Sequence, residues 1–185
     1  MLIPDSLRTL VDEGFIQEIL RPLKSGKEAA VYLVRVDGAI CAAKVYKQAQ
    51  LRSFRQRQDY VEGRQAGNTR DQRAMDNGSR FGKQKREEAW QTAEADAMRT
   101  LHAAGVRVPR PHGNHDGILL MDLVRGRSGD PAPQIAAGRF DHQVAFDMHY
   151  DIMHQIAKML CAGLVHADLS EFNILEAADG PIIID

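Results

Sequence analysis

The stretch LVHADLSEFNIL, residues 164–175, sets His166, Asp168 and Asn173 between apolar flanks. Neither a buried strand nor an amphipathic helix has this pattern. Phosphoryl transfer needs a carboxylate that accepts or orients the proton of the nucleophile, and oxygen ligands that hold Mg²⁺ against phosphates. Asp168 suits the first role. Asn173 suits the second, together with Asp185 at the end of the run PIIID, and His166 is expected to brace the loop through its ring nitrogens.

A plainer interpretation of this stretch is that His166 and Asp168 cap a turn between a helix and a strand. The apolar flanks, the spacing from Asp168 to Asn173 and the terminal IIID favour the catalytic interpretation. The order of residues also matches the protein-kinase loop H-R-D-L-x-x-x-N, with Ala167 in place of the arginine. We therefore expect no basic residue beside Asp168 to bind a phosphorylated activation loop.

A lysine and a glutamate upstream could complete such a site. Lys44 ends the run AICAAK, which is similar to the V-A-I-K strand whose lysine pairs with the α- and β-phosphates. Glu94 follows in a helical pattern between Ala93 and Ala97, and we expect it to hold Lys44. The ordinary alternatives are a surface lysine late in a strand and a glutamate on a solvated helix face.

The turn KSGKEAAVY, residues 24–32, is the candidate cover for the phosphates. It has one glycine, Gly26, where the pattern G-x-G-x-x-G-x-V has three, so it is weak alone. Ser25 and Lys27 add a hydroxyl and a cation, and backbone N–H groups at such a turn can cradle phosphate. Val31 stands at the position of the final valine.

Apolar residues elsewhere could hold the purine. Val31 and Ala42 are expected to contact it from one side and Leu175 from the other. Residues 121–124, including Met121 and Leu123, are expected to offer backbone groups to the adenine. Each of these residues also has an ordinary core interpretation, and only their association with the phosphate-binding candidates favours the nucleotide.

The elements that would position these residues follow from hydrophobic periodicity and turn signals. A helix is expected over 4–14, strands over 15–36 with a turn at SGKEA, an Asp37-Gly38 hairpin, a strand over 39–46, and helices over 84–104 and 141–161 on either side of a strand over 117–124. Val144, Met148, Ile152, Ile156 and Met159 share one face of the last helix.

That order predicts a two-lobed, protein-kinase-like α+β fold. Residues 1–124 would form an N-lobe, with the N-terminal helix, the phosphate-covering turn and a basic insertion over 48–86. Residues 125–185 would form a partial C-lobe, with the catalytic loop and a metal-binding hairpin.

Composition is that of an ordinary globular protein: 185 residues, 44% hydrophobic, 26% charged, net charge −1. Cys41 and Cys161 lie in apolar surroundings and are expected to be reduced core thiols. The N-terminus has no signal-peptide pattern, and no apolar run approaches the roughly 18 residues of a membrane span. We expect a cytoplasmic protein without membrane contact.

The insertion over 48–86 is the only strongly charged segment. It holds ten Arg or Lys against four Asp or Glu, about +6 in net charge. A solvated loop is the simpler expectation, and contact with RNA or the ribosome is the alternative. His142, His149 and His154 lie close together on the expected last helix, but no H-E-x-x-H pattern appears, so zinc is not expected.

Taken as a set, these motifs resemble the RIO family of atypical serine kinases. The matching parts are SGKEAAVY, AAKVY with its basic insertion, EADAMRTLHAAGVRVPRP, ILLMDLV, LVHADLSEFNIL and IIID, with Ser170 a feature of that family. The resemblance implies a trimmed protein-kinase fold that uses ATP and Mg²⁺, with Mn²⁺ as the alternative ion, and Ser170 among the ATP-binding residues. It also implies serine autophosphorylation, an unknown protein substrate, a role in small-subunit maturation, and an ATPase route in which Asp185 accepts the phosphate.

The sequence departs from this family where it stops at Asp185, since members continue with further helices, so a truncated product is expected. The N-terminal region is also short for the winged helix of one branch. Two rivals stay open. One is a small-molecule kinase of the aminoglycoside or choline type, which usually has H-G-D. The other is an ATP-binding assembly factor that clamps ribosomal RNA or a protein and turns over rarely.

Overall fold

The computed structural model of the protein describes residues 3–27, 29–47 and 93–185. They divide into two compact units. One comprises Met1–Ala93 and Gly113–Leu120, and the other Glu94–His112 and Met121–Asp185. The expected basic insertion over 48–86 and the first part of the helix expected over 84–104 lie outside the described residues.

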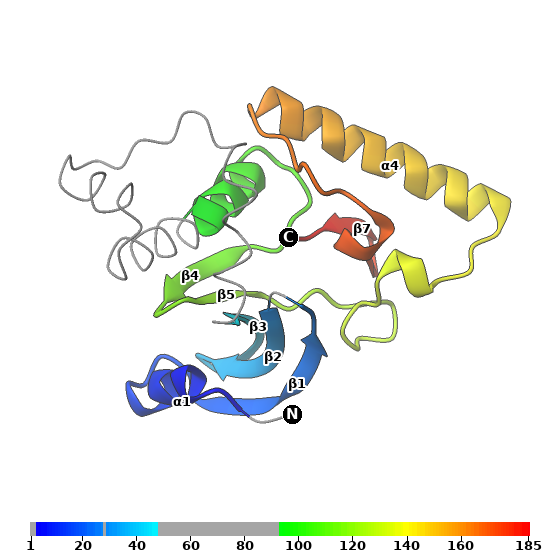
Figure 1. Ribbon diagram of the computed structural model, residues 1–185. Coiled ribbons are helices and arrows are strands. Elements are labelled where there is room, and N and C mark those ends of the chain that lie inside the picture. Colours follow the sequence, from blue (N-terminus) through cyan, green and yellow to red (C-terminus); the bar gives the residue numbers. More distant parts are fainter. Residues whose placement is uncertain (1–2, 28, 48–92) are drawn as a thin grey trace, which may run out of the picture. The chain divides into compact units, whose positions relative to one another are not determined.

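A five-stranded sheet with the order β1-β2-β3-β5-β4 forms the strand-rich part (Figure 1). The elements are α1 (Asp5–Asp12), β1 (Glu18–Ser25), β2 (Ala29–Val36), β3 (Ala39–Tyr46), β4 (Pro111–His115) and β5 (Ile118–Asp122). The β2–β3 turn is the predicted Asp-Gly hairpin, because both Asp37 (φ 48°) and Gly38 (φ 79°) adopt the left-handed conformation that a type I′ turn requires.

Strand alternation divides the side chains of β2 and β3 between two faces of the sheet. One face carries Tyr32, Val34 and Ala43, which are buried in one core cluster with Leu7 and Leu10 of α1. The helix expected over 4–14 is present as α1, and Leu7 and Leu10 form its buried face. The opposite face carries the cross-strand pairs Val31–Lys44 and Leu33–Ala42, so the candidate nucleotide residues of these strands share one face.

One edge strand, β4, differs from the sequence expectation, and the other, β1, contains a proline. β4 was not predicted, because Pro-His-Gly-Asn-His has neither strand alternation nor β-branched residues. β1 runs on through Pro22 to Ser25, with register shifts on both sides of Pro22. Both β1 and β4 lie at sheet edges, where a proline and unpaired N–H groups are tolerated.

The second unit packs two helices against a small hairpin. Residues 93–103 are helical, and η3 (Ile135–Ala137), α4 (His142–Cys161), η4 (Glu171–Asn173), β6 (Ile174–Ala177) and β7 (Gly180–Ile183) follow. Its core holds Leu101, Val106, Val108, Met159, Ile174 and Ile183. Gly105, at φ 73°, ends the first helix with its N–H bonded to the His102 carbonyl.

The long helix α4 was predicted well at its ends and less well on its buried face. It starts after Asp141, whose side chain accepts a hydrogen bond from Val144 N at 2.9 Å. Val144 was expected on the core face but is 38% exposed, whereas the polar Gln155 is buried beside Met159. Periodicity alone could not predict a buried glutamine, because its burial depends on a backbone partner from another segment.

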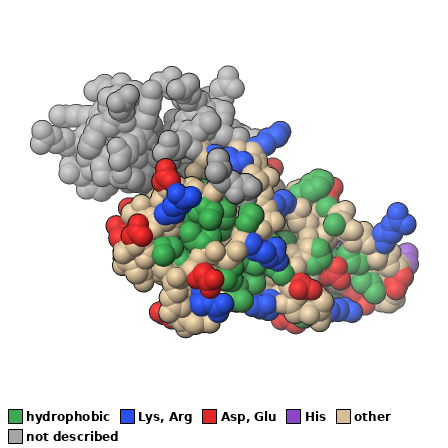
Figure 2. All heavy atoms as spheres, turned by 90° about the horizontal axis from the view of Figure 1, so that it is seen from below, with side chains coloured by type: hydrophobic (Ala, Val, Ile, Leu, Met, Phe, Trp, Pro, Cys, Tyr) green, Lys and Arg blue, Asp and Glu red, His purple; other side chains and the backbone are tan. Residues whose placement is uncertain are grey.

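Surface properties add three facts. Within the described residues, none of the helices has the length and hydropathy that a membrane crossing requires. Figure 2 shows Lys and Arg side chains interspersed with Asp and Glu over the face that it presents. Cys41 is buried as expected, but Cys161, the last residue of α4, is exposed, and neither cysteine forms a disulfide within the described part of the chain.

Candidate active site

The loop that carries His166 and Asp168 is tied to the chain end through the histidine ring. His166 Nε2 lies 3.1 Å from the carbonyl oxygen of Ile184, and Asp168 N donates to His166 Nδ1 at 3.4 Å. A carbonyl oxygen can only accept, so these partners assign the proton to Nε2 and leave Nδ1 as the acceptor. The geometry supports the expected bracing role of His166.

The turn between these two residues has an unusual backbone. Ala167 adopts φ 65°, in the left-handed region that costs a non-glycine residue roughly 1 kcal/mol. It stands where the protein-kinase loop has arginine. The Asp168 side chain is exposed, and within the described part of the chain no hydrogen bond or ion pair engages its carboxylate. That carboxylate is therefore available to a substrate hydroxyl.

Asn173 and Asp185 come to the same end of the β6–β7 hairpin. Ile174 pairs with Ile183, and Ile184 N donates to Asn173 O at 2.9 Å, so Asn173 lies opposite the residue before Asp185. Both were expected within strands. Instead Asn173 ends η4, and Asp185 lies beyond β7 with φ 69°.

The side chain of Asn173 is oriented by the loop that carries Asp168. Its Nδ2 donates to Asp168 O at 2.9 Å, which leaves the amide oxygen as the group that can bind a cation. One amide oxygen and the Asp185 carboxylate are hard donors that suit Mg²⁺, which usually keeps several waters and phosphate oxygens. No group of three His, Cys, Asp or Glu side chains within the described ranges is arranged to hold a metal. A cation here would therefore depend on nucleotide phosphates and water.

The second unit also brings Glu94 to this region. A cavity of about 140 Å³ is lined by Glu94, His166 and Asp185, with largely apolar walls from Ala97, Met98, Leu101, Val108, Met159, Leu164, Val165, Ile183 and Ile184. Three residues predicted from separate motifs thus share one cavity. Met98 and Leu101 follow Glu94 on the helix at spacings of four and seven, which places all three on one helical face.

The predicted phosphate-binding residues of the first unit are adjacent along the β-ladder. Ser25 pairs with Ala30 and Val31 with Lys44, so the turn, the valine and the lysine lie on neighbouring rungs. Lys44 is 8% exposed, and its Nζ lies 5.4 Å from the centroid of the Tyr46 ring. Lys44 and Glu94 lie in different units, so their ion pair stays a prediction.

The remaining candidates have ordinary structural positions. Met121 lies in β5 and Leu123 just beyond it, and Leu175 is half-buried in β6. Ser170 precedes η4, and its carbonyl accepts from Asn173 N at 2.9 Å. Lys27 is exposed at the β1–β2 turn. These positions neither require nor contradict nucleotide contact.

Two residues that the sequence did not single out support the site. Lys47 donates from Nζ to Ser25 Oγ at 2.8 Å and to Gly26 O at 2.6 Å. A lone exposed lysine after a strand gives no sequence signal for such a contact. The other residue is Arg107, in the segment that follows the first helix of the second unit.

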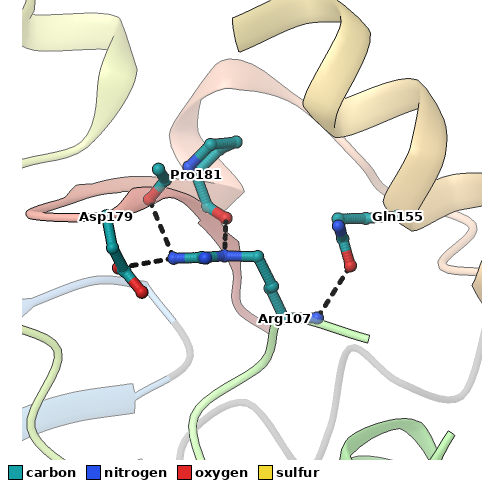
Figure 3. A network of polar contacts seen from close by, with 5 residues as sticks. Arg107, Gln155, Asp179 and Pro181 are labelled. Atoms are coloured by element: carbon teal, nitrogen blue, oxygen red, sulfur yellow. Dashed lines mark hydrogen bonds and ion pairs between the residues drawn. The ribbon is translucent and has the colours of Figure 1, made fainter. Parts of the chain in front are cut away.

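Arg107 holds the hairpin that ends in Asp185 (Figure 3). Its Nε donates to Pro181 O at 3.1 Å and its Nη2 to Asp179 Oδ1 at 2.5 Å, and its backbone carbonyl accepts from Ile183 N at 2.9 Å. Its own N–H donates to Gln155 Oε1 at 2.9 Å, which explains the buried glutamine of α4. The hydrogen bond from Arg107 lowers the pKa of Asp179.

The chain is similar to known proteins over most of its length. The family model of the RIO domain matches residues 30–185. The chain is 33% identical over 177 residues to the RIO-type serine/threonine-protein kinase Rio1 of Haloferax volcanii, covering 95% of this chain and 56% of that protein. It is 30% identical over 178 residues to the human serine/threonine-protein kinase RIO1, covering 95% and 30%. The chain therefore spans about half, or less, of the length of these relatives.

A solved structure gives the fold. The Rio2 kinase from Chaetomium thermophilum, crystallised as an ADP/Mg²⁺-phosphoaspartate complex, superimposes with a TM-score of 0.63 at 20% identity, covering 97% of this chain and 50% of that one. This confirms the predicted protein-kinase-like α+β fold.

Proposed function

Because this chain belongs to the RIO family, we propose that it transfers the γ-phosphoryl group of ATP, with Mg²⁺, to a serine hydroxyl on itself or on a protein substrate. One observation carries the proposal: Asp168, Asn173 and Asp185 converge through the contacts of a single loop and hairpin, with His166 bonded to both segments. A turn that merely capped a helix would not need the second contact of His166.

Each residue of the loop and hairpin receives a role. Asp168 accepts or orients the proton of the attacking serine. Asn173 and Asp185 would hold Mg²⁺, which neutralises charge on the phosphates when bound. His166 is a positioning residue that keeps Asp168 in register with the hairpin. Lys44 orients the α- and β-phosphates, and Glu94 holds Lys44.

The nucleotide contacts are proposed on the same basis. The β1–β2 turn would cover the phosphates, the shared face of β2 and β3 would contact the purine, and backbone groups after β5 would meet the adenine edge. The residues are Ser25, Gly26, Lys27, Val31, Ala42, Met121, Leu123, Ser170 and Leu175. The functional lobes remain 1–124 and 125–185.

A second candidate function is ATP hydrolysis through Asp185. The Rio2 kinase structure contains a phosphoaspartate. In this chain the Asp185 side chain is exposed at the hairpin end, beside the residue that pairs with Asn173. An Asp185 carboxylate oxygen would attack the γ-phosphorus, ADP would leave, and water would later hydrolyse the acyl phosphate. Hydroxylamine would release label from such an adduct and would leave phosphoserine intact.

Incubation with γ-labelled ATP and Mg²⁺ tests the main proposal. Wild type should incorporate label, and Lys44→Ala and Asp168→Ala should each lose at least about 100-fold in rate. Equal incorporation by all three proteins would refute the assigned roles. A parallel screen of aminoglycosides and choline tests the small-molecule alternative, which predicts transfer to those alcohols and none to protein.

The setting of the activity is also proposed. We expect the protein in the cytoplasm, acting on a protein or ribosomal partner. Contact with RNA through the basic insertion over 48–86 rests on its composition alone. Asp168→Ala could abolish phosphate transfer and leave co-sedimentation with ribosomes intact. That result would support the alternative function, an ATP-binding assembly factor that turns over rarely.

A further inference from the structure

Lys47 connects the residue after β3 to the β1–β2 turn. Its ammonium donates to Ser25 Oγ at 2.8 Å and to Gly26 O at 2.6 Å, across 22 and 21 residues of sequence. Lys47 directly follows β3, which carries Lys44 on its proposed nucleotide face. The turn is therefore bonded to the strand end that follows the phosphate-orienting lysine.

These two bonds change what the turn can offer to a ligand. A serine hydroxyl has one proton to donate, and its oxygen can accept at the same time. Because Ser25 Oγ already accepts from Lys47, its proton is left to point elsewhere. The Gly26 carbonyl oxygen, which would repel a phosphate, is likewise engaged by the ammonium. Two acceptors of the turn, Ser25 Oγ and Gly26 O, are thus occupied, and the Ser25 O–H donor stays available for an anion.

The turn has little else to hold it. Within the described residues its own internal bond is Gly26 N to Ala29 O at 2.9 Å. Ser25, Gly26 and Lys27 are all exposed, so the turn lacks support from a buried core. An exposed turn that lacks a buried core opens easily, and preorganising it reduces the ordering that a ligand must impose.

We propose that Lys47 is a positioning residue for nucleotide binding, a latch that holds the β1–β2 turn closed and presents it as a hydrogen-bond donor to ATP phosphates. This inference rests on the proposed function, and it assigns to Lys47 a role in setting the affinity of the same site for ATP. Lys47 acts through Ser25 and Gly26, and takes no part in the chemical step.

Two measurements on the full chain test the latch. The first is exchange of the Gly26 amide by NMR without nucleotide, which needs no activity. Lys47→Met should speed that exchange about fivefold, since one or two hydrogen bonds from a charged donor are lost. Lys47→Arg, which keeps a cationic donor, should restore most of the protection. Arg21→Met is the matched control, because it removes an exposed cation from β1, the strand that leads into the turn, and should leave the exchange unchanged.

The second measurement separates affinity from chemistry. Lys47→Met should raise KM for ATP about fivefold and leave kcat within about twofold, as expected when ground-state and transition-state binding weaken together. In a Ser25→Ala background the effect of Lys47→Met should shrink, because one of its partners is gone.

The outcomes of the exchange and KM measurements distinguish the latch from other roles of Lys47. Unchanged Gly26 exchange in Lys47→Met would overturn the latch. An equal rise in KM in Arg21→Met would assign the effect to general charge attraction, and an undiminished Lys47→Met effect in the Ser25→Ala background would make Lys47 a direct phosphate ligand. Absence of phosphate transfer in wild type would refute the proposed function alone, and the exchange experiment would still decide the latch.

Discussion

Replacing Arg107 by methionine should loosen the hairpin that ends in Asp185. The substitution keeps an unbranched apolar stem and removes the guanidinium bonds to Pro181 O and Asp179. The ion pair is partly wet, with the Arg107 side chain 29% exposed and that of Asp179 74% exposed, so it contributes at most about 1 kcal/mol. The bond to the part-buried Pro181 carbonyl adds roughly 1 kcal/mol.

Urea unfolding followed by circular dichroism at the helix band should show this loss. A deficit of about 2 kcal/mol, with a slope on the order of 2 kcal/mol per molar urea, shifts the midpoint down by about 1 M. Arg99→Met is the matched control. Its pair with Asp96 is an exposed helix pair at 2.6 Å, and its removal should cost at most about 0.5 kcal/mol.

The pH dependence gives the result an internal check. Arg107 lowers the pKa of Asp179 in the folded chain. The unfolded carboxyl therefore binds its proton first as the pH falls. The stabilisation is complete above the unfolded pKa of about 3.9 and is lost as pH falls through the folded pKa. The difference in unfolding free energy between wild type and Arg107→Met should become smaller below about pH 4. What then remains is the contribution of the hydrogen bond to Pro181 O. Equal urea midpoints of wild type and Arg107→Met at pH 7 would refute this reasoning. A difference in unfolding free energy that does not change with pH would also refute it.

Three further outcomes are expected. His166→Ala should destabilise the loop by about 1–2 kcal/mol in urea unfolding and lower phosphate transfer, because the bond to Ile184 O is lost; transfer at the wild-type rate would contradict its bracing role. Ala167→Gly should raise the unfolding free energy by about 0.5 kcal/mol by relieving φ 65°, whereas Ala162→Gly, at φ −79°, should lower it by a similar amount. Burial raises the pKa of Tyr32, so its phenol should stay neutral above pH 10 and stability should fall as pH rises through the folded pKa; absorbance titration of wild type against Tyr32→Phe checks this.

Local sequence patterns predicted the parts of this protein that depend on near neighbours. The Asp37-Gly38 turn and the bounds of α4 each follow from residues within a few positions of one another. The order H-A-D-L-S-E-F-N likewise predicts a catalytic loop, because the spacing of its polar residues is a property of one segment. The resemblance to the RIO family, which rests on this motif and the others, is confirmed by the family model that matches residues 30–185.

Features that depend on distant segments were missed or misplaced. β4 is a strand beside β5 even though its own residues carry no strand signal. Cys161 and Val144 were expected in the core, yet both are exposed. In each case the composition of the segment was compatible with more than one environment, and packing against other segments chose between them.

The contacts that support the site also depend on segments that are distant in the sequence. Sequence determined which residues could bind phosphate or a cation, since residue type and spacing set that chemistry. Tertiary structure alone decided that Lys47 would reach Gly26, that Arg107 would meet Asp179, and that His166 would bond Ile184. Those contacts join residues 18 to 72 positions apart, and such separations leave no periodic pattern in a chain because the partner is chosen by the fold.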